Sequence, residues 1–217
     1  MKLCLVMLFL FPACGMATDH PIVFTVFSPE PLTGLSYRPR PDQAPVPLVF
    51  YPTARSPDFA YVGPSRLQFF VGQDGKSAGE VVLPKSVRRV LLIVTPRPGP
   101  RGARRFHVSW ISDGPTSHPA GTLRLINDSG LRLTGLLGHR PTSIEHGADR
   151  LIPAASGTEI NLRVQVKARS YQACSIAVHV LPAERALLLL LPPYQRGAVE
   201  VQWRLLTDKI NPAQSIR

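Results

Sequence analysis

The chain has 217 residues, a formal net charge of +11, 23 prolines and 16 glycines. Its length is enough for two compact domains with their own cores, or for one large sandwich. The prolines and glycines are spread along the chain and no window shows a helical stripe of apolar residues, which argues against a helical fold.

The N-terminus has the pattern of an export signal. Lys2 gives the chain a basic start, residues 3–11 are apolar, and the small residues Gly15 and Ala17 occupy the two positions that a signal peptidase reads. This pattern predicts a signal peptide over residues 1–17. An alternative is a lipoprotein signal in which Cys14 receives a lipid anchor. After cleavage only Cys174 remains, so we predict a fold held by packing, with Cys174 as a small buried hydrophobic residue.

Alternation of apolar and polar residues recurs along the chain, and it is typical of antiparallel strands with one face on a core. Turn sequences that contain glycine separate these stretches. The predicted strands span residues 22–27, 47–51, 67–71, 80–83, 90–94, 106–110, 122–127, 131–136, 162–166, 175–181, 186–191 and 199–205.

The chain also repeats itself. Residues 82–110 begin with Val-Leu-Pro, continue through an aliphatic run and an Arg-Gly pair, and end on a tryptophan. Residues 180–203 follow the same order, with the aliphatic run Leu187–Leu191. Such a repeat indicates two copies of one β-rich domain. Trp110 and Trp203 end the two copies, and the alternation of their strands places both on the apolar, inward face. We therefore predict that both are buried anchors of the core.

The predicted fold class is therefore all-β, with two tandem antiparallel β-sandwich domains of immunoglobulin-like type related by an internal repeat. A Gly-, Pro- and Ser-containing stretch at 113–119 is the expected linker. The predicted organisation is a signal peptide at 1–17, domain 1 at 20–113, domain 2 at 114–210 and a C-terminal tail at 211–217.

Basic residues are concentrated in one stretch that contains no acidic residue. Such a stretch is a candidate surface for anionic polymer, phosphate or lipid headgroups. The alternative is an ordinary solvated basic surface, and without interleaved aromatic residues we expect no specific nucleic-acid binding. The residues are Lys85, Arg88, Arg89, Arg97, Arg101, Arg104 and Arg105.

No phosphate loop, metalloprotease motif or nucleophile elbow occurs, so we expect no enzymatic activity and no cofactor. One group of imidazole and carboxylate side chains follows Gly138, in what we predict to be a long loop. Zinc accepts both ligand types, so a metal-dependent enzyme is an alternative prediction. The residues are His139, Glu145, His146 and Asp149.

In size, charge and two-sandwich architecture the chain is similar to periplasmic pilus-assembly chaperones. That resemblance implies a protein that completes a partner's sheet with an exposed strand, and it carries no site residue over to this sequence. The main hypothesis is an exported, non-enzymatic cell-envelope protein, periplasmic or extracellular, that binds protein or anionic envelope polymer. A chaperone-like factor acting by strand pairing is the alternative. We expect no transmembrane span, because the longest aliphatic run, Leu187–Leu191, is too short, and the oligomeric state is left open.

Overall fold

The computed structural model describes residues 20–72, 76–99, 104–154 and 157–210. The predicted signal peptide with Cys14, the basic residue Arg101 and the predicted tail at 211–217 lie outside these ranges. The described residues form strands connected by turns and contain no helix, so none of them forms a helix that could span a membrane. The chain is therefore all-β, as its sequence predicts.

Eight strands precede the linker and eight follow it in the described residues. The first eight are β1 (His20–Phe27), β2 (Leu35–Tyr37), β3 (Val46–Pro47), β4 (Phe59–Gly63), β5 (Arg66–Val71), β6 (Ser77–Val82), β7 (Arg89–Pro98) and β8 (Arg104–Ser112). The second eight are β9 (Thr122–Asn127), β10 (Leu133–Leu137), β11 (Arg140–Ile144), β12 (Asp149–Pro153), β13 (Thr158–Val166), β14 (Arg169–Val178), β15 (Glu184–Leu191) and β16 (Gln202–Lys209).

The two sets of strands have the same topology. The first set forms sheets with the orders β4-β1-β7-β8 and β3-β2-β5-β6, and the second forms β12-β9-β15-β16 and β11-β10-β13-β14. In each set the first strand pairs in parallel with the seventh, β1 with β7 and β9 with β15. The strand order thus recurs position by position, which supports the internal repeat.

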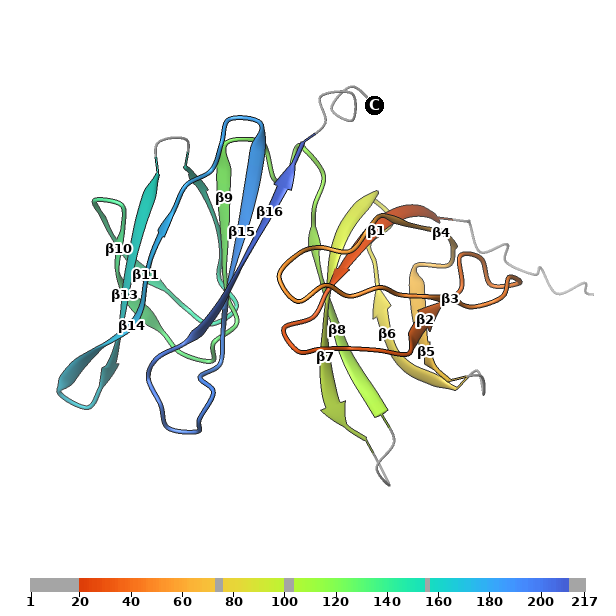
Figure 1. The fold of residues 1–217 in the computed structure, drawn as a ribbon, viewed down its shortest axis with the longest axis horizontal. Helices are drawn as coiled ribbons and strands as arrows, with labels where there is room; N and C mark the ends of the chain where they lie inside the picture. The colour runs from red at the N-terminus through yellow and green to blue at the C-terminus, as the bar shows by residue number, and fades with distance from the viewer. Residues whose placement is uncertain (1–19, 73–75, 100–103, 155–156, 211–217) are drawn as a thin grey trace, which may run out of the picture.

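Each pair of sheets encloses its own hydrophobic core, which suggests two domains; we refer to them as the N-terminal and C-terminal sandwiches (Figure 1). Phe24 and Phe69 are fully buried in the first core, and Leu125 and Leu162 in the second. In both sandwiches the inward residues alternate with outward ones, as the sequence pattern predicts.

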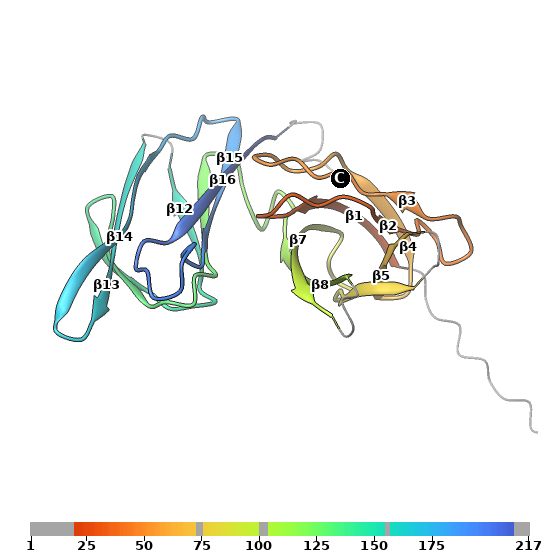
Figure 2. The same cartoon turned by 60° about the horizontal axis from the view of Figure 1, so that its bottom comes forward.

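The aliphatic runs of the repeat pack into the core of their own sandwich and also against the other sandwich, because their strands are buried on both faces. On β15, Leu188 and Leu190 point into the C-terminal core, while Leu187, Leu189 and Leu191 belong to a third cluster. That third cluster also contains Phe27, Leu91 and Ile111 of the N-terminal sandwich. The sheets that contain β7 and β15 therefore pack against each other, and Figure 2 shows β15 and β16 on the side of the C-terminal sandwich that faces β7. Because both faces of β15 are buried, every residue of the run is apolar, whereas a strand with one face in water would alternate apolar and polar residues.

Several predicted strand limits are wrong. The stretch 47–51 contributes only the end of β3, and the predicted long loop after Gly138 contains the short strands β11 and β12. Strand β16 begins at Gln202 rather than at residue 199, because Val201 instead donates its backbone N–H to Ala173 of the opposite sheet, at 3.0 Å. Short strands such as β2 and β4 were not predicted, since three to five residues give little periodicity.

The immunoglobulin-like type is not confirmed by the strand order. Constant-type immunoglobulin domains divide seven strands into sheets of four and three. Each sandwich here divides eight strands four and four, and its first strand pairs in parallel with its seventh. The structure thus supports two-sheet sandwiches in the broad sense.

Candidate binding cleft between the sandwiches

A cleft of about 860 Å³ lies where the two sandwiches diverge. One wall comes from the N-terminal sandwich, residues 28–31 after β1 and residues 52–53 before β4. The other wall comes from the C-terminal sandwich, from the loop between β15 and β16 and the first half of β16. The volume is in the range of known ligand sites, and such sites occur preferentially between domains.

Trp203 is the largest side chain in this cleft and corrects our prediction of a buried core anchor. Its pairing partner on β15 is Leu190, a core residue, so Trp203 lies on the inward face of β16, as predicted. The side chain is nevertheless 42% exposed, because β16 is an edge strand and the ring lies near its beginning, where it lines the cleft. Trp110, at the matching position of the repeat, is partly buried and packs against the N-terminal core.

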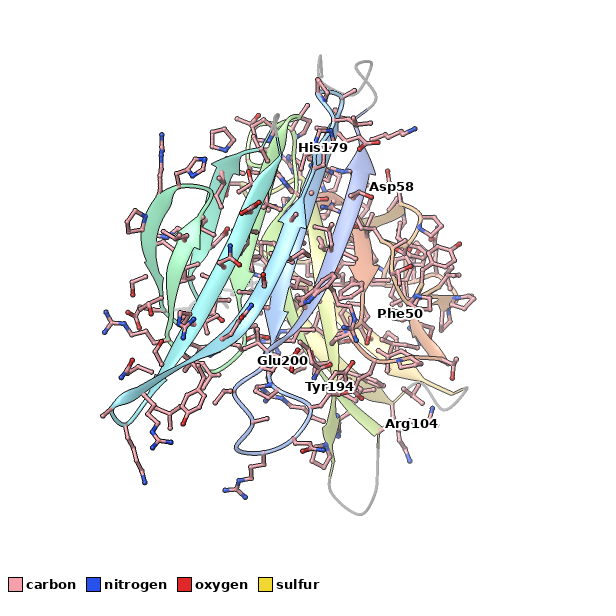
Figure 3. The ribbon with its side chains drawn as sticks, turned by 60° about the vertical axis from the view of Figure 1, so that its left-hand side comes forward. Phe50, Asp58, Arg104, His179, Tyr194 and Glu200 are labelled. Atoms are coloured by element: carbon pink, nitrogen blue, oxygen red, sulfur yellow. The ribbon has the colours of Figure 1, made fainter. Side chains whose placement is uncertain are left out.

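A second exposed aromatic residue lies in the same cleft. Tyr194 is 80% exposed and follows Pro192 and Pro193 in the loop between β15 and β16. Its hydroxyl oxygen lies 3.5 Å from the Arg204 guanidinium, and Figure 3 shows Tyr194 beside Glu200 at the lower end of the molecule. The cleft therefore combines flat apolar faces with polar groups, as ligand sites do. The sequence signals for this loop were the double proline before Tyr194 and the Arg-Gly pair of the repeat after it.

Hydrogen bonds from buried or half-buried residues hold both walls. On the N-terminal side, Val26 and Ser56 exchange two bonds: the Val26 N–H donates to Ser56 Oγ at 2.7 Å, and the Ser56 N–H donates to the Val26 carbonyl at 3.0 Å. On the C-terminal side, Gln202 Nε2 donates to the Pro192 carbonyl at 2.8 Å. These contacts fix the loops at their bases, which favours a preformed site.

A buried ion network joins the two sandwiches at the end of β15 and β16 that lies away from the cleft. Arg55, from the loop of the N-terminal wall, pairs with Asp113 at the end of β8. Arg185 of β15 binds the same carboxylate, with Nη2 3.1 Å from Asp113 Oδ2, and also binds Asp208 of β16 at 2.7 Å. Arg55, Asp113 and Arg185 are each at least 91% buried. Because one carboxylate is shared by cations of both sandwiches, the network fixes their relative orientation. Sequence reasoning missed it, since nothing in the sequence marks which charges meet.

Burial raises the pKa of Asp113, but its interaction with His118 and the positive charges of Arg55 and Arg185 outweigh this effect and lower the pKa to about 2. Since His118 Nδ1 lies 3.7 Å from Asp113 Oδ1, beyond hydrogen-bond distance, we attribute the lowering mainly to the two guanidinium groups. Asp113 is therefore ionised at neutral pH.

His118, in the linker, is fully buried next to this network. Its Nε2 lies 3.1 Å from the Ala186 carbonyl and must donate, because a carbonyl oxygen only accepts. Burial lowers the pKa of His118, Asp113 opposes this effect, and the charges of Arg55 and Arg185 lower the pKa further. His118 is therefore neutral at pH 7, with the proton on Nε2.

The predicted basic stretch is divided between the two ends of β7. Lys85, Arg88 and Arg89 lie at its beginning. Arg89 makes two bonds to Asp58, and Arg88 Nη1 lies 2.9 Å from His20 Nδ1. Figure 3 labels Asp58 near the upper end of the molecule. The beginning of β7 is thus an ordinary surface with paired charges.

The other group lies at the opposite end of β7, where Figure 3 labels Arg104 near the lower end of the molecule. Arg97, Arg104 and Arg105 line a second hollow there, of about 240 Å³. The structure therefore brings together three of the seven predicted basic residues, and Arg101 lies outside the described residues.

The predicted metal ligands are not gathered by the fold. His139 occupies the turn between β10 and β11, whereas the other three lie at the far end of β11 or after it. Each of those three already has a partner: Glu145 pairs with Arg132, Asp149 pairs with Arg124, and His146 Nδ1 accepts a hydrogen bond from the Gly130 N–H at 3.3 Å. In the described part of the chain, no three His, Cys, Asp or Glu side chains form a group suited to a metal ion.

Cys174 is 4% exposed in the C-terminal core, as predicted. Burial, together with the negative charge of Glu200, raises the pKa of its thiol to about 11, so the reactive thiolate is scarce at neutral pH.

Comparison with known protein families and with curated proteins finds no match to this chain.

Proposed function

We propose that this chain is an exported, non-enzymatic protein of the cell envelope that binds its partner in the cleft between the two sandwiches. In this proposal residues 20–113 and 114–210 are immunoglobulin-like domains only in the broad sense of two-sheet sandwiches that carry binding loops. The protein acts in the periplasm or outside the cell, as a binding or assembly module.

The observation that carries the proposal is the exposure of Trp203 and Tyr194 in a cleft whose walls are fixed. Large aromatic side chains dominate binding energies, and leaving them in water is unfavourable unless a partner covers them. The buried network around Asp113 holds the two sandwiches in one arrangement, so binding carries a small entropic cost for ordering the walls of the cleft.

The test is capture of partners from envelope extract by residues 18–217, the form that the predicted cleavage leaves, followed by mass spectrometry. The double variant Trp203→Ala/Tyr194→Ala is compared with Tyr171→Ala, which removes an aromatic side chain that is 39% exposed on β14, away from the cleft. We expect a partner that the wild type and Tyr171→Ala both retain at high salt and that the double variant loses. A partner captured equally by all three proteins would contradict the proposal.

Strand pairing is a second candidate, because β16 is an edge strand whose residues 202–205 line the same cleft. An extended peptide in the cleft would lie beside its unpaired backbone groups. Arg204, Asp208 and Lys209 place charges on this strand, and charges normally protect an edge from pairing. Slowed amide exchange in β16 on adding a peptide of alternating apolar residues would favour this candidate, and unchanged exchange would exclude it.

A further inference from the structure

We propose that Arg97, Arg104 and Arg105 form an oxyanion-binding site beside the cleft, and that the ligand of the cleft is an acidic saccharide. The site is the hollow of about 240 Å³ at the end of β7 and β8, whose other wall is the loop Pro31–Thr33. The saccharide class rests on the proposed function, whereas the oxyanion site stands on its own geometry.

The first argument is the pairing of like charges. Arg97 of β7 is the direct cross-strand partner of Arg105 of β8, and Arg104 is the next residue. Like charges directly opposite each other destabilise a sheet. In the described part of the chain none of the three guanidinium groups pairs with a carboxylate, and the sequence has no acidic residue between Glu80 and Asp113. An anion held between the arginines removes this repulsion.

The second argument is the geometry of the donors. Arg105 is partly positioned, because its Nη1 donates to the Ser77 carbonyl at 2.6 Å. Among the described residues its guanidinium makes no other hydrogen bond, which leaves donors for a ligand. Guanidinium groups bind carboxylate, sulfate and phosphate through paired, charge-assisted hydrogen bonds. Three of them around one hollow fit an oxyanion better than they fit a neutral ligand.

The third argument is the position of the site. Pro31 lines both this hollow and the cleft that contains Trp203 and Tyr194, so the two are neighbours on one surface. A ligand long enough to occupy both meets aromatic faces in one part and arginines in the other. An acidic oligosaccharide supplies both complements, since its ring C–H faces stack on aromatic rings and its carboxylates or sulfates bind arginine. A flat bilayer does not fit a concave site.

The test begins with sulfate as the probe, measured by titration calorimetry at constant ionic strength. The variant Arg97→Gln/Arg104→Gln is compared with Arg140→Gln/Arg150→Gln, which removes two exposed charges from β11 and β12. Each charge-assisted hydrogen bond is worth about tenfold in affinity, so we expect the first variant to weaken sulfate binding at least about tenfold and the control to leave it within about twofold. Absence of sulfate binding to the wild type, or equal weakening in both variants, overturns the site.

The saccharide class is tested with oligogalacturonate and its fully methyl-esterified form, which have the same sugar rings and differ in that each charged carboxylate is replaced by a neutral methyl ester. We expect the wild type to prefer the acidic form and Arg97→Gln/Arg104→Gln to lose that preference while still binding the neutral form. Tighter, arginine-dependent binding of oligoglutamate or of phosphatidylglycerol vesicles overturns the saccharide class. The variant Trp203→Ala separates the two proposals. If it leaves binding of the neutral form unchanged while the arginine variant still weakens sulfate binding, the cleft proposal fails and the oxyanion site stands.

Discussion

The two sandwiches meet in a closed region and part in an open one, and strands β15 and β16 supply side chains to both. In the closed region Leu189 and Leu206 are buried against the N-terminal sandwich and Arg185 is enclosed with its carboxylates. In the open region Trp203, on the same strand as Leu206, is exposed in the cleft. One strand pair can thus serve stability on one part of its surface and binding on another. Substitutions should separate these two effects.

The largest loss of stability is expected from Asp113→Ala in the closed region. The change leaves Arg55 without its carboxylate and Arg185 with only Asp208, and an unpaired buried charge costs about 3–5 kcal/mol. The control is Asp149→Ala, whose more exposed ion pair with Arg124 should be worth about 1 kcal/mol or less. Denaturant unfolding measures both. Equal costs would mean that the network contributes nothing beyond a surface ion pair.

The apolar part of the closed region should be nearly as sensitive. Leu189→Ala removes a side chain that is 1% exposed between the sandwiches, and we expect a loss of about 3 kcal/mol. Leu151→Ala, at a position that is 49% exposed, should cost about 0.5 kcal/mol. We also expect the wild type to unfold in one transition by calorimetry. Two transitions in the wild type, with Leu189→Ala affecting only one, would mean that the sandwiches are not coupled through this surface.

Acid should weaken the closed region in two steps. The pKa of Asp113 is lowered to about 2, so its stabilisation is complete above about pH 4, worth roughly 2 kcal/mol, and is lost as pH falls toward 2. The pKa of His118 is also lowered, so the unfolded chain takes up a proton first, and stability begins to fall as pH drops below about 6.5.

The measurement for this prediction is the unfolding free energy as a function of pH. Asp113→Asn should flatten the lower step and His118→Gln the upper one. A wild-type profile that stays flat from pH 7 to pH 3 would contradict the assigned charge states.

The smallest effect distinguishes the two tryptophans. Trp110→Ala should cost about 2 kcal/mol, because the ring packs against the N-terminal core, and Trp203→Ala about 1 kcal/mol, because its side chain is already 42% exposed. Thermal unfolding of the two variants measures the difference. A larger cost for Trp203→Ala would place that ring in the core and remove the basis of the cleft proposal.

The sequence predicted the strands whose side chains alternate, because alternation is a local pattern. It predicted the repeat as well, because residues 82–110 and 180–203 share the same order of motifs. It also predicted Leu187–Leu191 as a buried strand, which the structure confirms at every position. It did not predict what covers the second face of that strand, since the covering residues, such as Phe27 and Ile111, lie far away in the sequence.

The candidate site was harder to predict, and Trp203 shows why. The alternation of apolar and polar residues predicts correctly which face of β16 carries the ring. Whether the ring is covered depends on the edge position of β16 and on the opposite sandwich, which the alternation does not reveal. The basic stretch was visible in the sequence, but a strand of ten residues separates its two ends, so only Arg97, Arg104 and Arg105 share a hollow.

The most direct test uses the two tryptophans as reporters, since the chain contains only two. The variant Trp110→Phe leaves Trp203 as the sole tryptophan, and Trp203→Phe leaves Trp110. Acrylamide quenching of each variant is measured without and with saturating ligand, either the captured envelope partner or oligogalacturonate. We predict that Trp203 is readily quenched in the free protein and shielded in the complex, whereas Trp110 changes little. If saturating ligand leaves the quenching of Trp203 unchanged, the ligand binds elsewhere and the cleft is not the binding site.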